Sequence, residues 1–313
     1  MNKAPGKNRF WYLFGPFLIY WGIEFVGAMI ASLVMVIVSV PEVIQSVAWK
    51  DSMTNEEFME AAAQMQTMLL DMAARYQVQM LAAAALLTIP VLALLYRRDR
   101  LQEQMQGLPV NKKAPAYQYI WTAILGAMVC IGGNVLIVMT NLAFVSESYQ
   151  NTSAVFYAPA FAVQVVCLGL VIPVSEELLF RGLLFRRCRA LMGFFPAALS
   201  ISILFGFSHG NLVQFLYAMG LGMLLAYVCE KYGSLKAAIL LHVTANLTSL
   251  IMTETGFLDW ICGAFIRLAV TVVACAFFGA AMFVLIQRID EKPEGTDRTD
   301  DSGNIPLTKD MFR

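Results

Sequence analysis

The sequence contains few charged residues for its length. Only 14% of its 313 residues are Asp, Glu, Lys or Arg, and 59% are hydrophobic, whereas soluble domains have about 25% charged and roughly 45–50% apolar residues. The apolar residues form long unbroken runs, and the short alternating segments that build a membrane β-barrel are lacking. Because only helices and closed barrels satisfy their backbone groups in lipid, the sequence predicts an all-α polytopic membrane protein.

Other absences exclude further classes of protein. Basic and acidic residues number 22 each, so the net charge is zero and nothing indicates nucleic-acid binding. The six cysteines lie in or beside apolar runs without a CxxC pair, which argues against a disulfide or zinc framework. No cleavable signal peptide is expected, because the first apolar run is longer than an h-region of about 7–15 residues. We expect an integral membrane protein of a bacterial plasma membrane.

Eight apolar segments are candidates for membrane-spanning helices, which need about 20 residues. The fifth is the shortest and could be a half-span. The segments are Phe10–Val40, Val78–Tyr96, Tyr119–Phe144, Tyr157–Leu179, Phe194–Phe207, Leu212–Val228, Leu235–Met252 and Ile261–Ile286.

The distribution of basic residues supports this count. Lys and Arg gather at the N-terminus, in every second loop and after the last span, whereas the first loop is acidic and the third, fifth and seventh loops contain neither Lys nor Arg. By the positive-inside rule, both termini are expected on the cytoplasmic side. The first loop, 41–77, is expected to be partly helical and either to lie on the outer surface or to extend the second span.

Ionisable residues within the expected spans are few, and such residues are costly and usually functional. Both histidines of the chain are among them. His209 ends the fifth span, and His242 lies in the seventh with Asn246 one turn later on the same helix face. Histidine is the acid–base and metal-ligand residue at neutral pH. Glu24 and Arg267, in the first and eighth spans, are weaker candidates that could pair or face a cavity.

The segment SEELLFRGLLF, residues 175–185, places two adjacent carboxylates at the expected end of the fourth span. Adjacent residues diverge by about 100° on a helix, so Glu176 and Glu177 cannot serve one site equally. Glu177 precedes Arg181 by four residues, the favourable order for an ion pair, which leaves Glu176 as the freer base. Pro173, one turn earlier, is expected to kink the helix and open space there.

These residue types favour peptide hydrolysis without a covalent intermediate. A carboxylate and a histidine can deprotonate a water molecule, and a second pair of donors can stabilise the oxyanion formed on an amide. Serine proteolysis is disfavoured, because Ser208 directly precedes His209 and adjacent side chains point apart on a helix. HExxH zinc proteolysis is disfavoured, because that motif does not occur. A zinc site of Glu176, His209 and His242 remains open, since His, His and Glu form a catalytic ligand set. Each pair alone could also be a structural ion pair or interhelical hydrogen bond.

Three motifs, EELLFRG (176–182), FGFSH (205–209) and HVTAN (242–246), follow one another along the chain. Their patterns, EExxxR, FxxxH and HxxxN, resemble in this order the CPBP family, which groups CAAX prenyl endopeptidases with bacteriocin-processing and immunity proteins and is also called the Abi family. The resemblance covers about Val171–Leu250. It implies a CAAX-protease-like helical bundle with glutamate-dependent intramembrane endopeptidase activity and no metal.

The resemblance also implies a role for each residue. Glu176 and His209 would activate the water, His242 and Asn246 would form the oxyanion hole, and Glu177 and Arg181 would support the site. The expected substrate is a membrane-associated or lipidated peptide or protein, surrounded by membrane lipids. A non-catalytic bacteriocin-immunity or scaffold protein that keeps the motifs for binding is the main alternative. A proton-coupled transporter is another, although we find no inverted repeat.

We expect one transmembrane domain, 1–290, with a catalytic core at about 157–252, and a disordered polar cytoplasmic tail, 291–313. One geometric conflict follows. Counted from the cytoplasmic side, Glu176 would lie near the surface, His242 about 10 Å in and His209 about 20 Å in. The three residues can meet only if the fifth span starts below the membrane surface, is oblique or is a half-span. The site is then expected in the cytoplasmic half of the membrane.

Overall fold

The computed structural model describes residues 9–47, 53–106 and 114–290, in which every regular element is helical. Within these ranges, seven helices are long and apolar enough to cross a membrane. The prediction of an all-α polytopic membrane protein is therefore confirmed. The fifth predicted span is the 14-residue helix α9 (Phe194–Phe207), whose length of about 21 Å is too short to cross. The predicted tail lies outside the described residues, and the side on which the termini lie stays a prediction.

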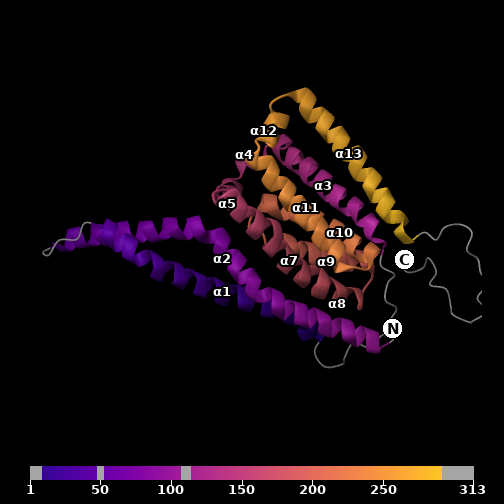
Figure 1. The fold of residues 1–313 in the computed structure, drawn as a ribbon, viewed down its shortest axis with the longest axis horizontal. Helices are drawn as coiled ribbons and strands as arrows, with labels where there is room; N and C mark the ends of the chain where they lie inside the picture. Colours follow the sequence, from indigo (N-terminus) through magenta and orange to yellow (C-terminus); the bar gives the residue numbers. More distant parts are fainter. Residues whose placement is uncertain (1–8, 48–52, 107–113, 291–313) are drawn as a thin grey trace, which may run out of the picture.

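The first two helices form a long antiparallel hairpin that projects beyond the rest of the molecule (Figure 1). Helix α1 (Arg9–Ser46) has 38 residues and α2 (Asn55–Met105) has 51, which correspond to about 57 and 77 Å. A capping box between Thr54 and Glu57 begins α2. Of the two expectations for the first loop, extension of the second span is the one observed.

The other helices form the bundle in Figure 1. One long member, 161–189, consists of several helical segments and is described below. The other long members are α3 (Tyr119–Met139), α10 (Leu212–Tyr232), α11 (Leu235–Glu254) and α13 (Phe265–Gln287). Its short members are η1 (Ala116–Gln118), α4 (Leu142–Val145), α5 (Glu147–Tyr157), α12 (Phe257–Cys262) and η4 (Arg288–Asp290).

Two predicted span limits are wrong for local reasons. The third span was expected to reach Phe144, but α3 ends at Met139 because Asn141 turns the chain with a positive φ of 58°. The eighth span was expected to start at Ile261, which instead belongs to α12, and α13 starts at Phe265 after the extended residue Ala264.

The fourth span is a composite helix, 161–189, with two π-helical segments. It consists of α6 (Phe161–Gln164), the π-helical η2 (Val165–Val171), α7 (Ile172–Glu177), the π-helical η3 (Leu178–Phe185) and α8 (Arg186–Arg189). The helix continues through Pro173, whose expected kink stays a prediction. π-Helical turns are rare and occur often at functional sites.

The expectation that Glu176 and Glu177 end this span is wrong. The helix runs three further turns to Arg189, because η3 is buried along its whole length and Glu177 pairs with Arg181. Glu176 therefore lies about 20 Å from the Arg189 end of its helix, and His209 lies about 22 Å beyond the start of α9. Measured from these two neighbouring helix ends, Glu176 and His209 thus lie at nearly the same depth, and the conflict expected from the sequence disappears. The position of the site relative to the bilayer midplane stays a prediction.

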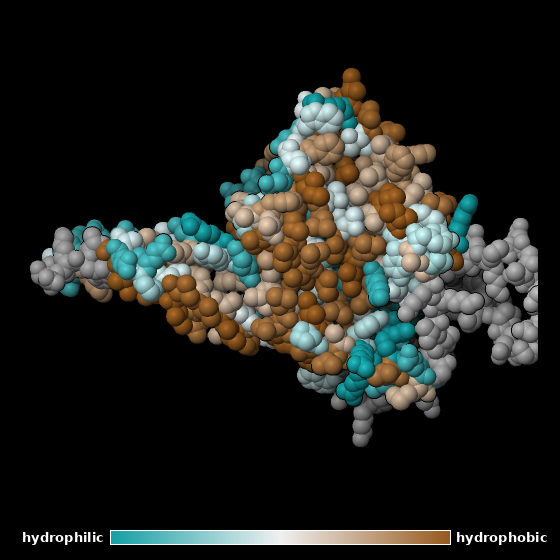
Figure 2. Space-filling model, in the orientation of Figure 1, coloured by the Kyte–Doolittle hydropathy of each residue, from teal (hydrophilic) through white to brown (hydrophobic). Residues whose placement is uncertain are grey.

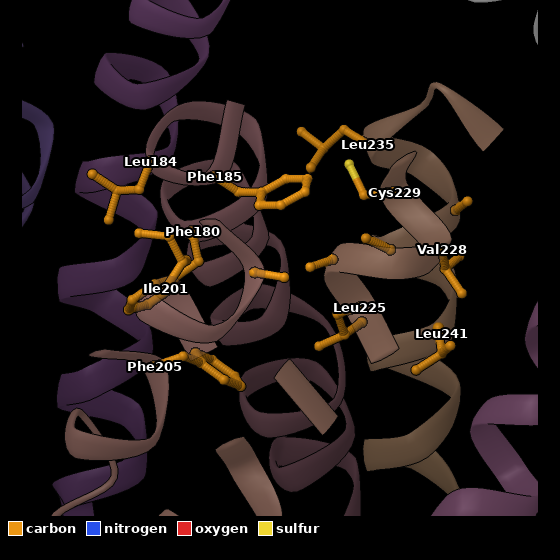
Figure 3. Packing of buried hydrophobic residues seen from close by; sticks show 14 of the residues in the cluster. Phe180, Leu184, Phe185, Ile201, Phe205, Leu225, Val228, Cys229, Leu235 and Leu241 are labelled. Atoms are coloured by element: carbon orange, nitrogen blue, oxygen red, sulfur yellow. The ribbon is translucent and has the colours of Figure 1, made fainter. Parts of the chain in front are cut away.

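The main core lies where η3, α9, α10 and α11 meet (Figure 3). Phe180, Phe205, Leu225 and Leu241 are fully buried there. Small residues let the helices approach closely, as is common in membrane bundles. A Cβ atom on Gly222 of α10 would lie 2.9 Å from the Ser202 side chain of α9.

The surface separates into an apolar body and polar ends (Figure 2). Exposed apolar side chains cover α1 and α13 in particular, as expected for helices that contact lipid. One polar end carries ion pairs that tie α8 to α2 and α10. Arg187 pairs with Asp99 at 2.7 Å and Arg189 pairs with Glu230 at 2.6 Å. This is the end that the positive-inside rule assigns to the cytoplasm.

Candidate active site

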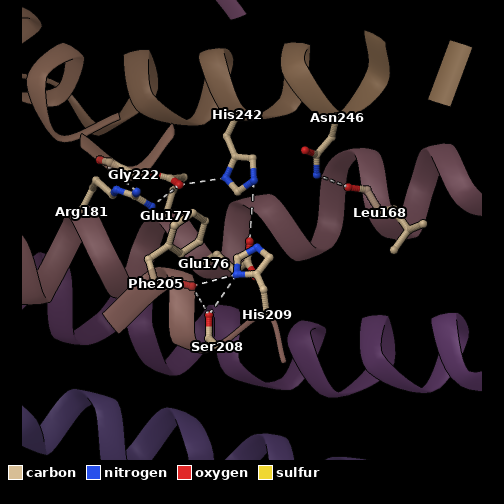
Figure 4. A network of polar contacts seen from close by, with 10 residues as sticks. All are labelled: Leu168, Glu176, Glu177, Arg181, Phe205, Ser208, His209, Gly222, His242 and Asn246. Atoms are coloured by element: carbon tan, nitrogen blue, oxygen red, sulfur yellow. Dashed lines mark hydrogen bonds and ion pairs between the residues drawn. The ribbon is translucent and has the colours of Figure 1, made fainter. Parts of the chain in front are cut away.

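Three helices bring the predicted site residues to one cavity of about 940 Å³. Helix α7 supplies Glu176, the turn after α9 supplies His209, and α11 supplies His242 and Asn246. Figure 4 shows the side chains of Glu176, His209 and His242 directed toward one another from separate helices, with Asn246 one turn along α11 and directed to Leu168. These segments lie far apart in the sequence, so only the packing of the helices makes them neighbours.

Glu177 and Arg181 form a buried ion pair behind the cavity. Arg181 Nη1 donates to Glu177 Oε1 at 2.7 Å, and both side chains are at most 1% exposed. Arg181 Nη2 also donates to the Gly222 carbonyl at 3.3 Å, and the guanidinium lies 4.4 Å from the centre of the Phe205 ring. The ion pair predicted from the i, i+4 spacing is thus present, and it joins α7 and η3 to α9 and α10.

The ring of His242 is oriented by Glu177. His242 Nδ1 lies 2.8 Å from Glu177 Oε1. A carboxylate only accepts, so Nδ1 carries a proton and donates it. His242 Nε2 faces the other carboxylate, with Glu176 Oε2 at 3.8 Å. That distance is too long for a direct hydrogen bond. Glu176 thus keeps its oxygens available to the cavity, and its role as the base stays a prediction.

The ring of His209 is oriented by its own helix end. His209 Nδ1 lies 2.8 Å from the Phe205 carbonyl oxygen, which can only accept, so Nδ1–H donates and Nε2 is left without a proton in the neutral ring. The His209 ring also packs edge-on against the Phe205 ring, with centroids 4.8 Å apart. In Figure 4 this ring lies beside the Glu176 carboxylate. Ser208 Oγ is bound to the same carbonyl at 2.7 Å.

Asn246 links α11 to the π-helical segment η2. Its Nδ2 donates to the Leu168 carbonyl at 2.9 Å, and the side chain lines the cavity. An amide nitrogen has two hydrogens. One hydrogen of Asn246 is therefore held by η2, and the second is available to a bound substrate.

The described ranges contain no group of three His, Cys, Asp or Glu residues placed to hold a metal ion. The alternative zinc set of Glu176, His209 and His242 does not form such a group, because His242 directs Nδ1 to Glu177 and its Nε2 is 3.8 Å from Glu176. The present side-chain positions therefore do not fit a zinc centre. The predicted absence of a metal itself stays a prediction.

Of the two weaker candidates, Glu24 and Arg267, only Glu24 lines the cavity. Glu24 lines the cavity together with Tyr20 and Trp21 of α1. Arg267 does not line it, and instead stacks on Trp260 at 4.6 Å where α12 meets α13. The sequence showed Glu24 as an intramembrane carboxylate, but not which neighbour its helix face meets.

The comparisons with known proteins cover the segment that carries the site. Residues 158–248 match the family model described as Type II CAAX prenyl endopeptidase Rce1-like. Over 109 residues the chain is 26% identical to the Bacillus subtilis protein named "Putative membrane peptidase YdiL", covering 34% of this chain and 45% of that protein. The chain thus matches less than half of this relative's length. No solved structure matches the chain. The resemblance to the CPBP family is confirmed over this segment.

Proposed function

We propose that this protein is an intramembrane endopeptidase that hydrolyses a peptide bond with a water molecule activated by Glu176 and His209. The convergence of Glu176, His209 and His242 on one cavity of about 940 Å³ carries the proposal. The match of residues 158–248 to an endopeptidase family supports it.

Glu176 and His209 are suited to activate a water molecule. The Glu176 side chain is 16% exposed, and neither of its oxygens is taken up by the Glu177–Arg181 pair. His209 Nε2 is an acceptor in the neutral ring, because Nδ1–H is bound to the Phe205 carbonyl. A water between these two groups loses a proton to Glu176 while its oxygen adds to the peptide carbonyl carbon.

His242 and Asn246 are suited to stabilise the resulting oxyanion. His242 must then carry a proton on Nε2 as well as on Nδ1, and the adjacent Glu177 carboxylate stabilises that positive ring. Asn246 contributes its second Nδ2 hydrogen. As the tetrahedral intermediate collapses, the C–N bond breaks and the proton held by Glu176 passes to the leaving nitrogen.

The walls around this polar centre are suited to an apolar substrate segment. Apolar side chains such as Val129, Ile137, Phe156 and Leu221 line the same cavity as Glu176. We therefore expect the substrate to be a membrane-associated or lipidated peptide or protein, in which apolar groups occupy these walls. The bacterial plasma membrane remains the expected location.

The test is peptide cleavage by the purified protein in detergent. Quenched-fluorescent peptides, with and without a prenyl group, are offered to the wild type, to Glu176→Gln and to the control Glu42→Gln, whose side chain is exposed on α1 outside the cavity. We expect cleavage by the wild type and the control, loss of about 10²–10⁴-fold in Glu176→Gln, and no effect of a chelator. Full activity of Glu176→Gln would contradict the proposal. Loss with chelator and recovery with zinc would make these residues metal ligands.

A further inference from the structure

Helix α1 contributes a second carboxylate to the cavity. Glu24 lies on the face of α1 that also carries Tyr20, Trp21 and Ala28, and all four residues line the cavity that contains Glu176. Residues at these spacings share one side of a helix. Helix α1 packs against α2, η3 and α8, and these four residues make it part of the cavity wall.

Glu24 is hydrogen-bonded to the neutral Tyr20 side chain one turn earlier and has no cationic partner. Its Oε1 atom is buried and makes no hydrogen bond. No Lys or Arg lines the cavity, and the guanidinium of Arg181 behind it is already bound to Glu177 and Gly222. Charged groups at membrane depth are usually paired with one another or directed into a polar cavity. In the proposed mechanism His242 is positive, but its partner is Glu177. Glu24 thus has no cationic partner among the residues that line the cavity, and a bound molecule can supply one.

The neighbours of Glu24 are also suited to a cation. Tyr20 and Trp21 place aromatic rings on the same helix face, and aromatic faces attract ammonium and guanidinium groups. Glu176, the other carboxylate of this cavity, interacts electrostatically with Glu24. Two carboxylates and two aromatic rings in one largely apolar space favour a positive group and repel a negative one.

We propose that Glu24, Tyr20 and Trp21 form a subsite for a cationic group of the substrate, such as a Lys or Arg side chain or a free amino group near the scissile bond. The inference rests on the proposed endopeptidase function and specifies its substrate class. Glu24 acts here as a specificity-determining residue that selects peptides and does not take part in bond cleavage. A peptide with a carboxylate at the same position binds more weakly.

Binding measured without cleavage tests the subsite. The Glu176→Gln protein is placed in zwitterionic nanodiscs, and fluorescein-labelled octapeptides of Ala, Leu and Phe carry Lys, norleucine or Glu at each position in turn. Fluorescence anisotropy gives each Kd. At one position we expect Lys to bind at least about tenfold more tightly than norleucine, since hydrogen bonds to charged groups contribute this much or more. Glu binds most weakly there.

Adding Glu24→Gln to this protein should reduce the Lys preference to about one, whereas adding Glu42→Gln on the same helix should leave it intact. Glu24→Lys should reverse the preference toward Glu. Absence of a Lys preference at every position, or its persistence in Glu24→Gln, would overturn the subsite. If Glu24→Lys does not fold, Glu24→Gln alone decides.

The two proposals fail separately. A Lys preference that depends on Glu24, combined with no cleavage of any peptide by the wild type, would support the subsite and count against the endopeptidase function. Cleavage that depends on Glu176 but ignores the charge of the peptide would support the function and overturn the subsite.

Discussion

Replacement of Arg181 by Met tests how the wall behind the active site is held together. The guanidinium is fully buried, donates to Glu177 at 2.7 Å and to the Gly222 carbonyl, and stacks on Phe205. Without it, the buried Glu177 carboxylate keeps only the hydrogen bond with His242. Removal of one member of a buried ion pair costs about 3–5 kcal/mol, because the other charge is left uncompensated.

The matching double variant separates charge from packing. In Arg181→Met/Glu177→Gln no unpaired charge remains, so we expect most of the lost stability to return. The Gln side-chain oxygen can still accept from His242 Nδ1. The positive form of His242 would lack its carboxylate, however, so the double variant should be stable but slow in peptide hydrolysis.

Thermal unfolding in detergent measures these differences. A loss of about 3–5 kcal/mol should lower Tm by about 6–20 °C at roughly 2–4 °C per kcal/mol. The control is Arg189→Met, whose partly exposed pair with Glu230 should contribute only about 0–1 kcal/mol. The reasoning is refuted if Arg181→Met and Arg189→Met unfold at the same temperature, or if the double variant is no more stable than Arg181→Met.

Other predictions follow from single contacts. Asn246→Ala should lower kcat about 10²–10³-fold with little change in KM, and unchanged progress curves would remove Asn246 from the oxyanion hole. Gly126→Ala should lower the free energy of unfolding by about 1–3 kcal/mol, because its Cβ would lie 2.6 Å from the Leu241 carbonyl oxygen. Gly133→Ala is the matched control, because a Cβ added at Gly133 would meet no neighbouring atom within 4 Å. Equal Tm values for the two variants would contradict the packing described.

The polar contacts within single helices could be predicted from the sequence. The spacing of Glu177 and Arg181 specified their ion pair, and the spacing of His242 and Asn246 placed both side chains on one face of α11. These predictions succeeded because the geometry of one helix turn depends only on residue number. The hydrogen bond from Asn246 to Leu168 depends on a π-helical carbonyl, which no sequence pattern indicated.

Features that depend on packing between helices were missed or misplaced. The sequence analysis placed the end of the fourth span just after Glu176 and Glu177. Arg181 is in fact neutralised by Glu177 within one turn, and the apolar residues that follow are buried. The basic residues at 186–189 were the better signal for its end. Glu24 could not be assigned to the cavity, because the face that α1 turns toward the bundle is set by its contacts with α2 and η3.

The most direct test of the account is whether Glu176 and His209 act on the same water. We would measure kcat/KM for peptide cleavage by the wild type, Glu176→Gln, His209→Gln and the double variant. Each single change should reduce kcat/KM by about 10²–10⁴-fold, and the double variant should be no slower than the slower single variant, because groups that act as a unit are non-additive. Full activity in either single variant, or losses that multiply in the double variant, would contradict the joint role of Glu176 and His209.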